Sequence, residues 1–357
     1  MFRSSHDIGN LLPFKEMMPR RHGSSRGGWL LGTAVAFGAM AAYVQYRTRK
    51  AEAENPPMGK FIEVDGVQLH YEDRGQGQPI VFLHGNGAMA RELDISGLTD
   101  MAAKNYRVIV FDRPGYGYSE RPRTTLWDPV TQAHLLHRAL LKIGIEKPIV
   151  VGHSWASMVA IAMALEHPDY VRSLLLLSGY YYPTARLDAL LFSPPALPVI
   201  GDLMRHTISP VLGRLIWPAM VRKLFAPAET TPRFEHEYPV WMGLRPSQIR
   251  AAAEEAGLMI PSAAKLEKRY RDLKTPVTIM AGAGDLQAIC HLHSEQLHKE
   301  LPQSELIVVP DVGHMIHHSA PDKVMSAIDR LATTSALQEN GRGNVSVFPD
   351  SRSRSLH

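Results

Sequence analysis

A short apolar strand runs directly into a serine and then into a helix, and few folds contain such a junction. Residues 148–153 (PIVVGH) read as a buried strand and residues 154–167 as a helix, with Ser154 at the junction. Gly152 and Ala156 stand two residues before and after this serine. A sharp strand-to-helix turn requires small side chains at those positions. The pattern predicts that Ser154 is a nucleophile on such a turn; an ordinary helix N-cap is the alternative.

Short apolar runs alternate with helical stretches from Lys60 onward, which indicates a largely parallel sheet wound by helices. Asp65-Gly66 is a hairpin signal, so we expect the two strands that flank it to form an antiparallel edge. The further expected strands are 79–84, 107–112, 148–153, 171–178, 276–282 and 305–310. The expected helices are 129–143, 154–167, 291–301 and 321–333.

A serine hydroxyl needs a base within hydrogen-bond reach, and that base needs a carboxylate to orient it. Asp285 follows one expected strand in AGAGD, and His314 follows the next strand in DVGH. The chain order is therefore Ser154, Asp285, His314, which this topology would bring together at one end of the sheet.

Other acidic and imidazole side chains are weaker candidates for these roles. Asp311 is too close in sequence to His314 to orient its ring, and Asp272 precedes its strand and so falls at the wrong end of the sheet. We expect His153 to pack beside its strand, and His317 and His318 to line or cap the site.

Acyl transfer places negative charge on the substrate oxygen, so the site also needs amide donors. The loop His84-Gly85-Asn86-Gly87 directly follows an expected strand and carries little side-chain bulk. We assign the oxyanion hole to the backbone amides of Asn86 and Trp155. A glycine-rich turn without this function is the alternative for the loop.

Five motifs stand in the order of one family: HGNG (84–87), DRPGYGYSERP (112–122), GHSWA (152–156), GAGD (282–285) and VGH (312–314). From about residue 60 to 333 the chain resembles the α/β-hydrolase fold family. The resemblance implies an α/β fold with a mostly parallel eight-stranded sheet and helices on both faces. It also implies a core at 60–178 and 262–333 and a helical cap at 179–261, inserted after the sixth strand.

Asn86 and Trp155 resemble the haloalkane dehalogenase and epoxide hydrolase branch of that family in particular. That branch uses aspartate where this chain has Ser154. A serine attacking an alkyl carbon would form an ether that water cannot open, so dehalogenation and epoxide opening are disfavoured. Tyr180 and Tyr181, at a strand end, are expected to line the substrate cavity.

Composition excludes several other classes of function. The single cysteine, Cys290, rules out an intrachain disulfide and a thiolate metal cluster. Residues 61–357 carry 30 Lys and Arg against 31 Asp and Glu, so nothing in the charge calls for a nucleic-acid partner. No His and carboxylate spacing indicates a metal, and we expect no cofactor.

The two ends of the chain fall outside the resemblance. Residues 1–26 form a basic segment, and 27–44 are eighteen uncharged residues that would span about 27 Å as a helix, a marginal membrane span. We therefore expect a single-pass anchor at 27–46 and a linker at 47–59; a cleaved secretory signal is the alternative. The flanking charge leaves the side of the membrane open, with an extracytoplasmic position slightly favoured. Residues 334–357 are expected to be a disordered tail.

These patterns together predict a serine hydrolase acting on small to medium apolar carboxylic esters through an acyl-enzyme. A meta-cleavage carbon-carbon hydrolase and a cofactor-free perhydrolase share the same triad and remain alternatives. A ligand receptor on a hydrolase scaffold is the alternative that is not an enzyme. Neither the precise ester nor the oligomeric state follows from the sequence.

Overall fold

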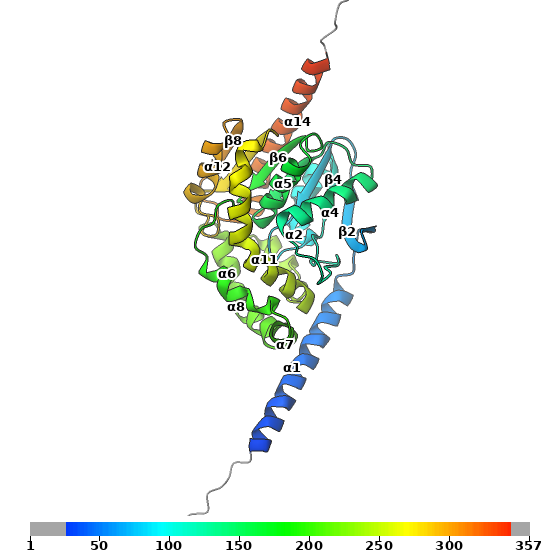
Figure 1. Cartoon of the computed structure of the whole chain (residues 1–357), viewed down its shortest axis with the longest axis vertical. Helices are drawn as coiled ribbons and strands as arrows, with labels where there is room; N and C mark the ends of the chain where they lie inside the picture. Colours follow the sequence, from blue (N-terminus) through cyan, green and yellow to red (C-terminus); the bar gives the residue numbers. More distant parts are fainter. Residues whose placement is uncertain (1–25, 344–357) are drawn as a thin grey trace, which may run out of the picture. The chain divides into compact units, whose positions relative to one another are not determined.

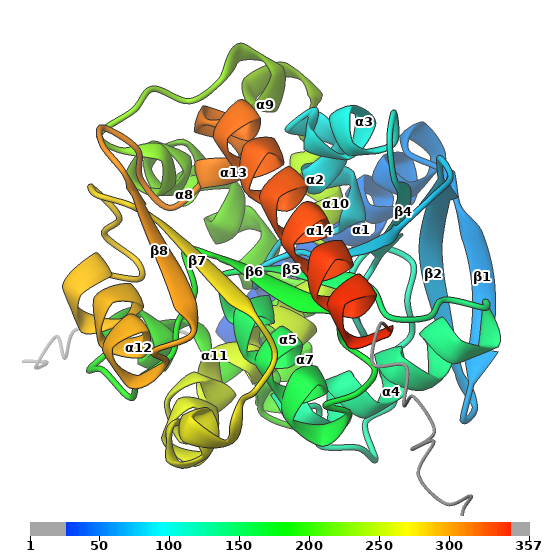
Figure 2. The same cartoon turned by 90° about the horizontal axis from the view of Figure 1, so that it is seen from above.

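A computed structural model describes residues 26–343 and contains one eight-stranded sheet (Figures 1 and 2). The strand order is β1-β2-β4-β3-β5-β6-β7-β8. β1 pairs antiparallel with β2, β2 pairs antiparallel with β4, and all other pairs are parallel. The strands are β1 Lys60–Val64, β2 Val67–Arg74, β3 Pro79–Leu83, β4 Arg107–Phe111, β5 Ile149–His153, β6 Ser173–Leu177, β7 Val277–Gly282 and β8 Ser304–Val309. The predicted fold class is confirmed, including the antiparallel edge.

Helices cover both faces of this sheet because successive strand residues point to opposite sides. Val81 and Leu83 on β3 join the hydrophobic core on the face covered by α4 and α5, whereas Ile80 and Phe82 join the core on the face covered by α2, α3 and α14. Figure 2 shows these two helical layers on either side of the strands. The helices are α2 Ala90–Ile95, α3 Leu98–Ala102, α4 Pro129–Lys142, α5 Trp155–Glu166, α12 Ser294–Glu300, α13 Ile316–Ser319 and α14 Pro321–Gly343.

Between β6 and β7 the described chain is helical. Figure 1 shows α6, α7, α8 and α11 gathered in one group, and α11 contacts the other three. The predicted cap interval, 179–261, ends inside α11, because Pro261 removes one helical hydrogen bond without ending the helix. The α-helices of this interval are α6 Leu187–Phe192, α7 Ile200–His206, α8 Ile208–Phe225, α9 Pro232–Glu237, α10 Val240–Gly243 and α11 Pro246–Leu266, and a short 3-10 helix, Pro194–Ala196, lies between α6 and α7.

The predicted transmembrane anchor at 27–46 is wrong. The predicted membrane localisation rested on this anchor and is therefore wrong as well. Within the described residues, no helix combines the length and the apolar character that crossing a bilayer needs. The apolar run is diluted by glycine, alanine and threonine, and it belongs to a longer helix, α1 (Arg26–Glu54), which continues into the charged sequence RTRKAEAE.

The last turns of α1 pack on the folded domain, where a linker was expected. Val44 and Ala51 are buried. The Arg47 guanidinium lies 4.3 Å from the ring centre of Trp241 on α10, and Glu52 pairs with Arg245 at 3.0 Å. The predicted basic segment, 1–26, lies almost entirely outside the described part of the chain, which begins at Arg26. At the opposite end, α14 continues to Gly343, and residues 344–357 lie outside it.

The buried carboxyl of Glu72 on β2 gives the stability of the fold a dependence on pH. Burial, together with the nearby Asp94 carboxylate, raises the pKa of Glu72 to about 7. Because the folded state holds this proton more tightly than the unfolded state, stability should fall as pH rises from about 4.5 through 7. We expect Glu72→Gln to raise the melting temperature at pH 8 and to change it little at pH 5. Differential scanning fluorimetry at both pH values checks this, with the exposed Glu146→Gln as the control; equal effects at both values would contradict it.

Candidate active site

The Ser154 backbone adopts the strained conformation that a sharp strand-to-helix turn requires. Its φ is 55° and its ψ is −121°, a region that side-chain-bearing residues rarely occupy, at a cost of about 1–3 kcal/mol. The Ser154 N–H donates to the carbonyl of Leu177 on β6 at 2.9 Å, which holds the turn against the sheet. A methyl group on Gly152 would come within 2.7 Å of the Ala156 carbonyl oxygen, so this position accepts only glycine.

Ser154, His314 and Asp285 form a continuous hydrogen-bond chain. The Ser154 Oγ lies 2.9 Å from Nε2 of His314, and Nδ1 of His314 lies 2.8 Å from Oδ2 of Asp285. Asp285 and His314 follow β7 and β8, so the two strand ends deliver them to the end of β5 that carries the serine. A carboxylate can only accept, which puts the ring hydrogen on Nδ1 and leaves Nε2 free to accept from the hydroxyl.

The Asp285 carboxylate is buried but is held in its ionised form. Burial alone would raise the pKa of Asp285, but His314 and the backbone N–H groups of Ala288 and Gln287 outweigh it and lower that pKa. The two amides donate to Oδ1 at 3.0 and 2.7 Å, while Oδ2 faces the imidazole. An ionised carboxylate in this position fixes the ring tautomer and stabilises the imidazolium.

The loop His84–Gly87 lies against the nucleophile turn. A methyl group built on Gly85 would come within 3.1 Å of Cβ of Ser154. The Asn86 side chain donates to the carbonyl of Ala252 in α11 and accepts from the hydroxyl of Tyr116, both at 3.2 Å. Trp155 is the first residue of α5, where the backbone N–H has no acceptor within the helix. The assignment of the oxyanion hole to the backbone N–H groups of Asn86 and Trp155 stays a prediction.

A buried ion pair that the sequence analysis did not find holds this loop. Arg113, after β4, donates to the carbonyl oxygens of His84 at 2.7 Å and Gly85 at 3.0 Å. Its guanidinium forms two hydrogen bonds with the carboxylate of Glu255 on α11, and both side chains are fully buried. Tyr116 and Gln132 also donate to Glu255, at 2.7 and 3.0 Å. Arg113 stands in the DRPGYGYSERP motif, but nothing local in the sequence marks Glu255 as its partner.

Tyr180 and Tyr181 are buried, and their hydrogen bonds include Thr184 and His293. The Tyr180 hydroxyl donates to the carbonyl of Thr184 at 3.0 Å, and the Tyr181 N–H donates to Nδ1 of His293 at 3.2 Å. Burial raises the pKa of Tyr181 far above its usual value. These contacts brace the start of the cap, and a role for either tyrosine in substrate binding stays a prediction.

Three further side chains converge near His153, whose ring packs between those of His314 and His317. Nε2 of His317 and Nε2 of His318 each lie 2.5 Å from the same oxygen, Oε1 of Glu92. All three residues are buried, and their ligand atoms lie within 4.8 Å of one another, as three metal ligands would. Sequence spacing missed the cluster because 225 residues separate Glu92 from His317.

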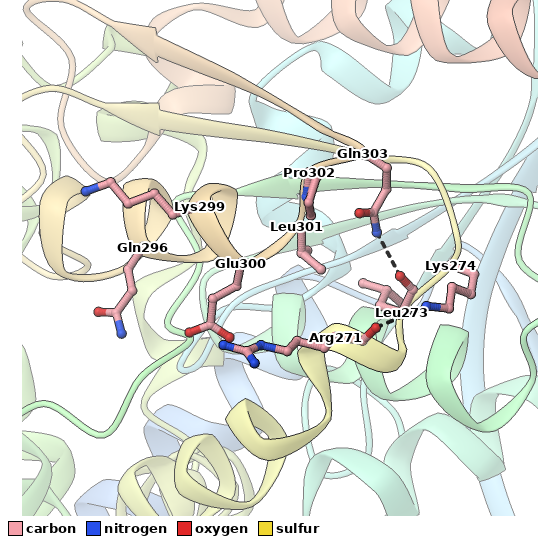
Figure 3. A pocket seen from close by; sticks show the side chains of 9 residues that line it. All are labelled: Arg271, Leu273, Lys274, Gln296, Lys299, Glu300, Leu301, Pro302 and Gln303. Carbon is pink, nitrogen blue, oxygen red and sulfur yellow. Dashed lines mark hydrogen bonds between the residues drawn. The ribbon is translucent and has the colours of Figure 1, made fainter.

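A surface pocket of about 710 Å³ lies at the opposite end of the strands (Figure 3). It includes Leu273, just before β7, and Gln303, just before β8, whereas Asp285 and His314 follow those strands. Charged and amide side chains such as Arg271, Lys274 and Glu300 stand around it, and the Gln303 side chain donates to the carbonyl of Leu273 at 2.7 Å. This pocket is therefore separate from the serine site.

Comparison with known proteins places the chain in a family. The model of the alpha/beta hydrolase fold matches residues 78–321. A 2-hydroxymuconate semialdehyde hydrolase of Pseudomonas putida is 28% identical over 184 residues, which cover 49% of this chain and just under two thirds, 66%, of that protein. A probable proline iminopeptidase of Leptolyngbya boryana is 28% identical over 311 residues, 77% of this chain and 92% of the relative.

A solved esterase (EaEST) from Exiguobacterium antarcticum has the same fold, with a TM-score of 0.61 and 22% identity over 77% of this chain and 100% of its own. The family match, the sheet topology and the strand-end positions of the three residues agree with one another. The chain belongs to the alpha/beta hydrolase fold family.

Proposed function

We propose that this protein is a serine hydrolase that cleaves carboxylic esters through an acyl-enzyme intermediate. The single observation that carries the proposal is the chain of hydrogen bonds at 2.9 and 2.8 Å from Ser154 through His314 to Asp285. A hydroxyl that donates to a neutral ring nitrogen, whose opposite N–H is bound by a carboxylate, is the arrangement that activates serine at neutral pH.

In the first half of the reaction, the Ser154 oxygen attacks the acyl carbon and His314 takes the hydroxyl proton. The negative charge on the former carbonyl oxygen is stabilised by the backbone N–H groups of Asn86 and Trp155. The ester C–O bond then breaks, and His314 gives the proton to the leaving alcohol. Asp285 keeps the ring oriented and stabilises its cation.

In the second half, water replaces the alcohol beside His314. The imidazole accepts a proton from this water, whose oxygen attacks the acyl-enzyme carbonyl. The bond to Ser154 breaks, and the proton returns to the serine oxygen. The products are the carboxylic acid and the free enzyme, so one water is consumed for each ester and no cofactor takes part.

An apolar substrate suits the cap, which exposes many large apolar side chains. Leu187, Leu191, Phe192 and Val199 are each more than half exposed, and Leu215 on α8 is 73% exposed. We infer that part of this apolar surface faces the substrate, and an apolar lining favours substrates whose acyl or alcohol part is a hydrocarbon. We therefore propose small to medium apolar esters.

A carbon-carbon hydrolase of the meta-cleavage type is the second candidate. The observation in its favour is the similarity to the 2-hydroxymuconate semialdehyde hydrolase of Pseudomonas putida. Initial rates on nitrophenyl esters of graded chain length, on a vinylogous diketone and in peracid formation separate the candidates. The ester proposal requires that the highest kcat/KM of all these substrates is measured on one of the esters.

Covalent labelling tests the nucleophile. A fluorophosphonate should label the folded protein once, at Ser154, because the activated oxygen attacks phosphorus as it attacks an acyl carbon. The label should be lost in Ser154→Ala and retained in the exposed control Ser247→Ala, as measured by intact-protein and peptide mass spectrometry. Folded wild-type protein that takes up no label would favour a receptor without turnover.

A further inference from the structure

The buried cluster of Glu92, His317 and His318 joins two segments that the acyl-transfer site depends on. Glu92 lies on α2, six residues after Asn86 of the oxyanion loop. His317 and His318 lie on α13, three and four residues after His314. The Glu92 carboxylate is therefore a direct link between the helix that follows the oxyanion loop and the helix that follows the catalytic base.

Both hydrogen bonds to Glu92 are of the charge-assisted kind. A carboxylate only accepts, so each imidazole carries its hydrogen on Nε2 and donates to Oε1. Burial alone would raise the pKa of Glu92, but the two imidazoles outweigh it and hold that pKa well below its usual value. Glu92 is thus ionised at neutral pH. In a buried setting such hydrogen bonds resist rearrangement more strongly than they would at the surface.

The same three side chains could in principle hold a metal ion, but their surroundings favour the hydrogen-bonded arrangement. Metal binding through both Nε2 atoms would move the ring hydrogens to Nδ1. Among the described residues, neither Nδ1 of His317 nor Nδ1 of His318 has a hydrogen-bond partner. Metal-binding histidines almost always donate that second N–H to an acceptor. The carboxylate arrangement leaves no imidazole N–H unpaired in this cluster.

His153 lies between this cluster and His314 and contacts both. Its ring centre lies 4.4 Å from that of His317 and 4.9 Å from that of His314. The Nε2–H of His153 donates to the carbonyl oxygen of His314 at 3.1 Å. A methyl group on Gly85 would come within 3.0 Å of Nδ1 of His153, so this ring also touches the oxyanion loop.

We propose that Glu92 is a positioning residue of the acyl-transfer site: its carboxylate, by binding both His317 and His318, keeps the catalytic base and the oxyanion donors in register around Ser154. The inference rests on the proposed function. Its physical basis is that a displacement of about 1 Å between reacting groups lowers a rate by about 100-fold. Glu92 contacts neither the substrate nor the reacting atoms and acts through the two segments that it joins.

The test compares Glu92→Gln with a control on the same helix, Asp94→Asn. Asp94 is also a buried carboxylate of α2, but it binds Thr99 and Arg74 instead of the histidines. We expect Glu92→Gln to lower kcat and the rate of fluorophosphonate labelling by about 10- to 100-fold with KM within threefold. Asp94→Asn should lower the melting temperature and leave kcat within threefold. All rates are measured well below each variant's melting temperature.

A second pair of variants separates hydrogen bonding from packing. His318→Gln retains an N–H near the position of Nε2 and should keep kcat within about fivefold of wild type, whereas His318→Leu should resemble Glu92→Gln. Combining His318→Leu with Glu92→Gln should add little further loss, because both changes weaken the same link: one removes a donor and the other removes the charge of the acceptor.

Three results would overturn the proposal. In the first, Glu92→Gln is labelled as fast as wild type. In the second, His318→Gln and His318→Leu lose activity equally. In the third, elemental analysis finds one equivalent of metal in the wild type that is absent from Glu92→Gln. Failure of the proposed function is a distinct outcome, because in that case the wild-type protein itself takes up no label at Ser154.

Discussion

Replacing His314 by alanine is expected to lower kcat by about 10⁴- to 10⁶-fold, because the hydroxyl of Ser154 then has no base within reach. Asp285→Asn should cost about 10³- to 10⁴-fold, since the ring remains but loses the carboxylate that fixes its tautomer. Steady-state rates on a nitrophenyl ester and the rate of fluorophosphonate labelling measure both effects.

The control for this series is His291→Ala, an exposed histidine that should leave kcat within twofold. Circular dichroism and the melting temperature establish that each variant is folded. If His314→Ala keeps more than about one hundredth of the wild-type turnover, another group is the base. A silent Asp285→Asn would place the orienting acid elsewhere.

Glu255→Ala is expected to cause the largest loss of stability of the changes considered, about 3–5 kcal/mol. The variant leaves the Arg113 guanidinium buried without its carboxylate, and an unpaired buried charge is far more costly than an unpaired surface charge. Chemical denaturation measures the loss. The neighbouring Glu254→Ala is the matched control, because Glu254 is partly exposed in its pairing with Arg121 and should matter much less.

A double variant separates the two roles of this pair. Arg113→Met with Glu255→Leu removes both charges, so we expect it to recover much of the stability lost in Glu255→Ala. Turnover should stay low, because the hydrogen bonds from Arg113 to the carbonyls of His84 and Gly85 are also gone. Recovery of both stability and turnover would contradict a role for Arg113 in holding the oxyanion loop.

The parts of the structure that the sequence predicted correctly are those with local signals. The run PIVVGH followed by Ser154 and a helix contains its own turn, because the small neighbours of the serine and the change of periodicity lie within twenty residues. Asp285 and His314 also have a local signal, because each stands shortly after the end of a strand. Once the strands are parallel, their shared carboxyl edge brings such residues together without further information.

The parts that sequence reasoning missed depend on pairs of distant residues. Glu255 reads as one more polar residue on a helix, and only the docking of α11 shows that it meets Arg113, 142 positions earlier. Glu92 likewise meets its histidines only after α2 and α13 pack together. The anchor at 27–46 failed for a different reason. Counting uncharged residues ignored how weakly apolar glycine and alanine are, and ignored the continuation of the helix to Glu54.

The contact between the end of α1 and the cap has a practical consequence for laboratory work on this protein. Arg47 covers Trp241, and Glu52 is the ionic partner of Arg245, which immediately precedes α11, the helix that carries Glu255. A recombinant version trimmed to start at Pro56 would uncover that tryptophan and strip Arg245 of its counter-charge. Substrate preferences measured on such a trimmed enzyme would describe an altered cap, so specificity is best assayed with α1 retained.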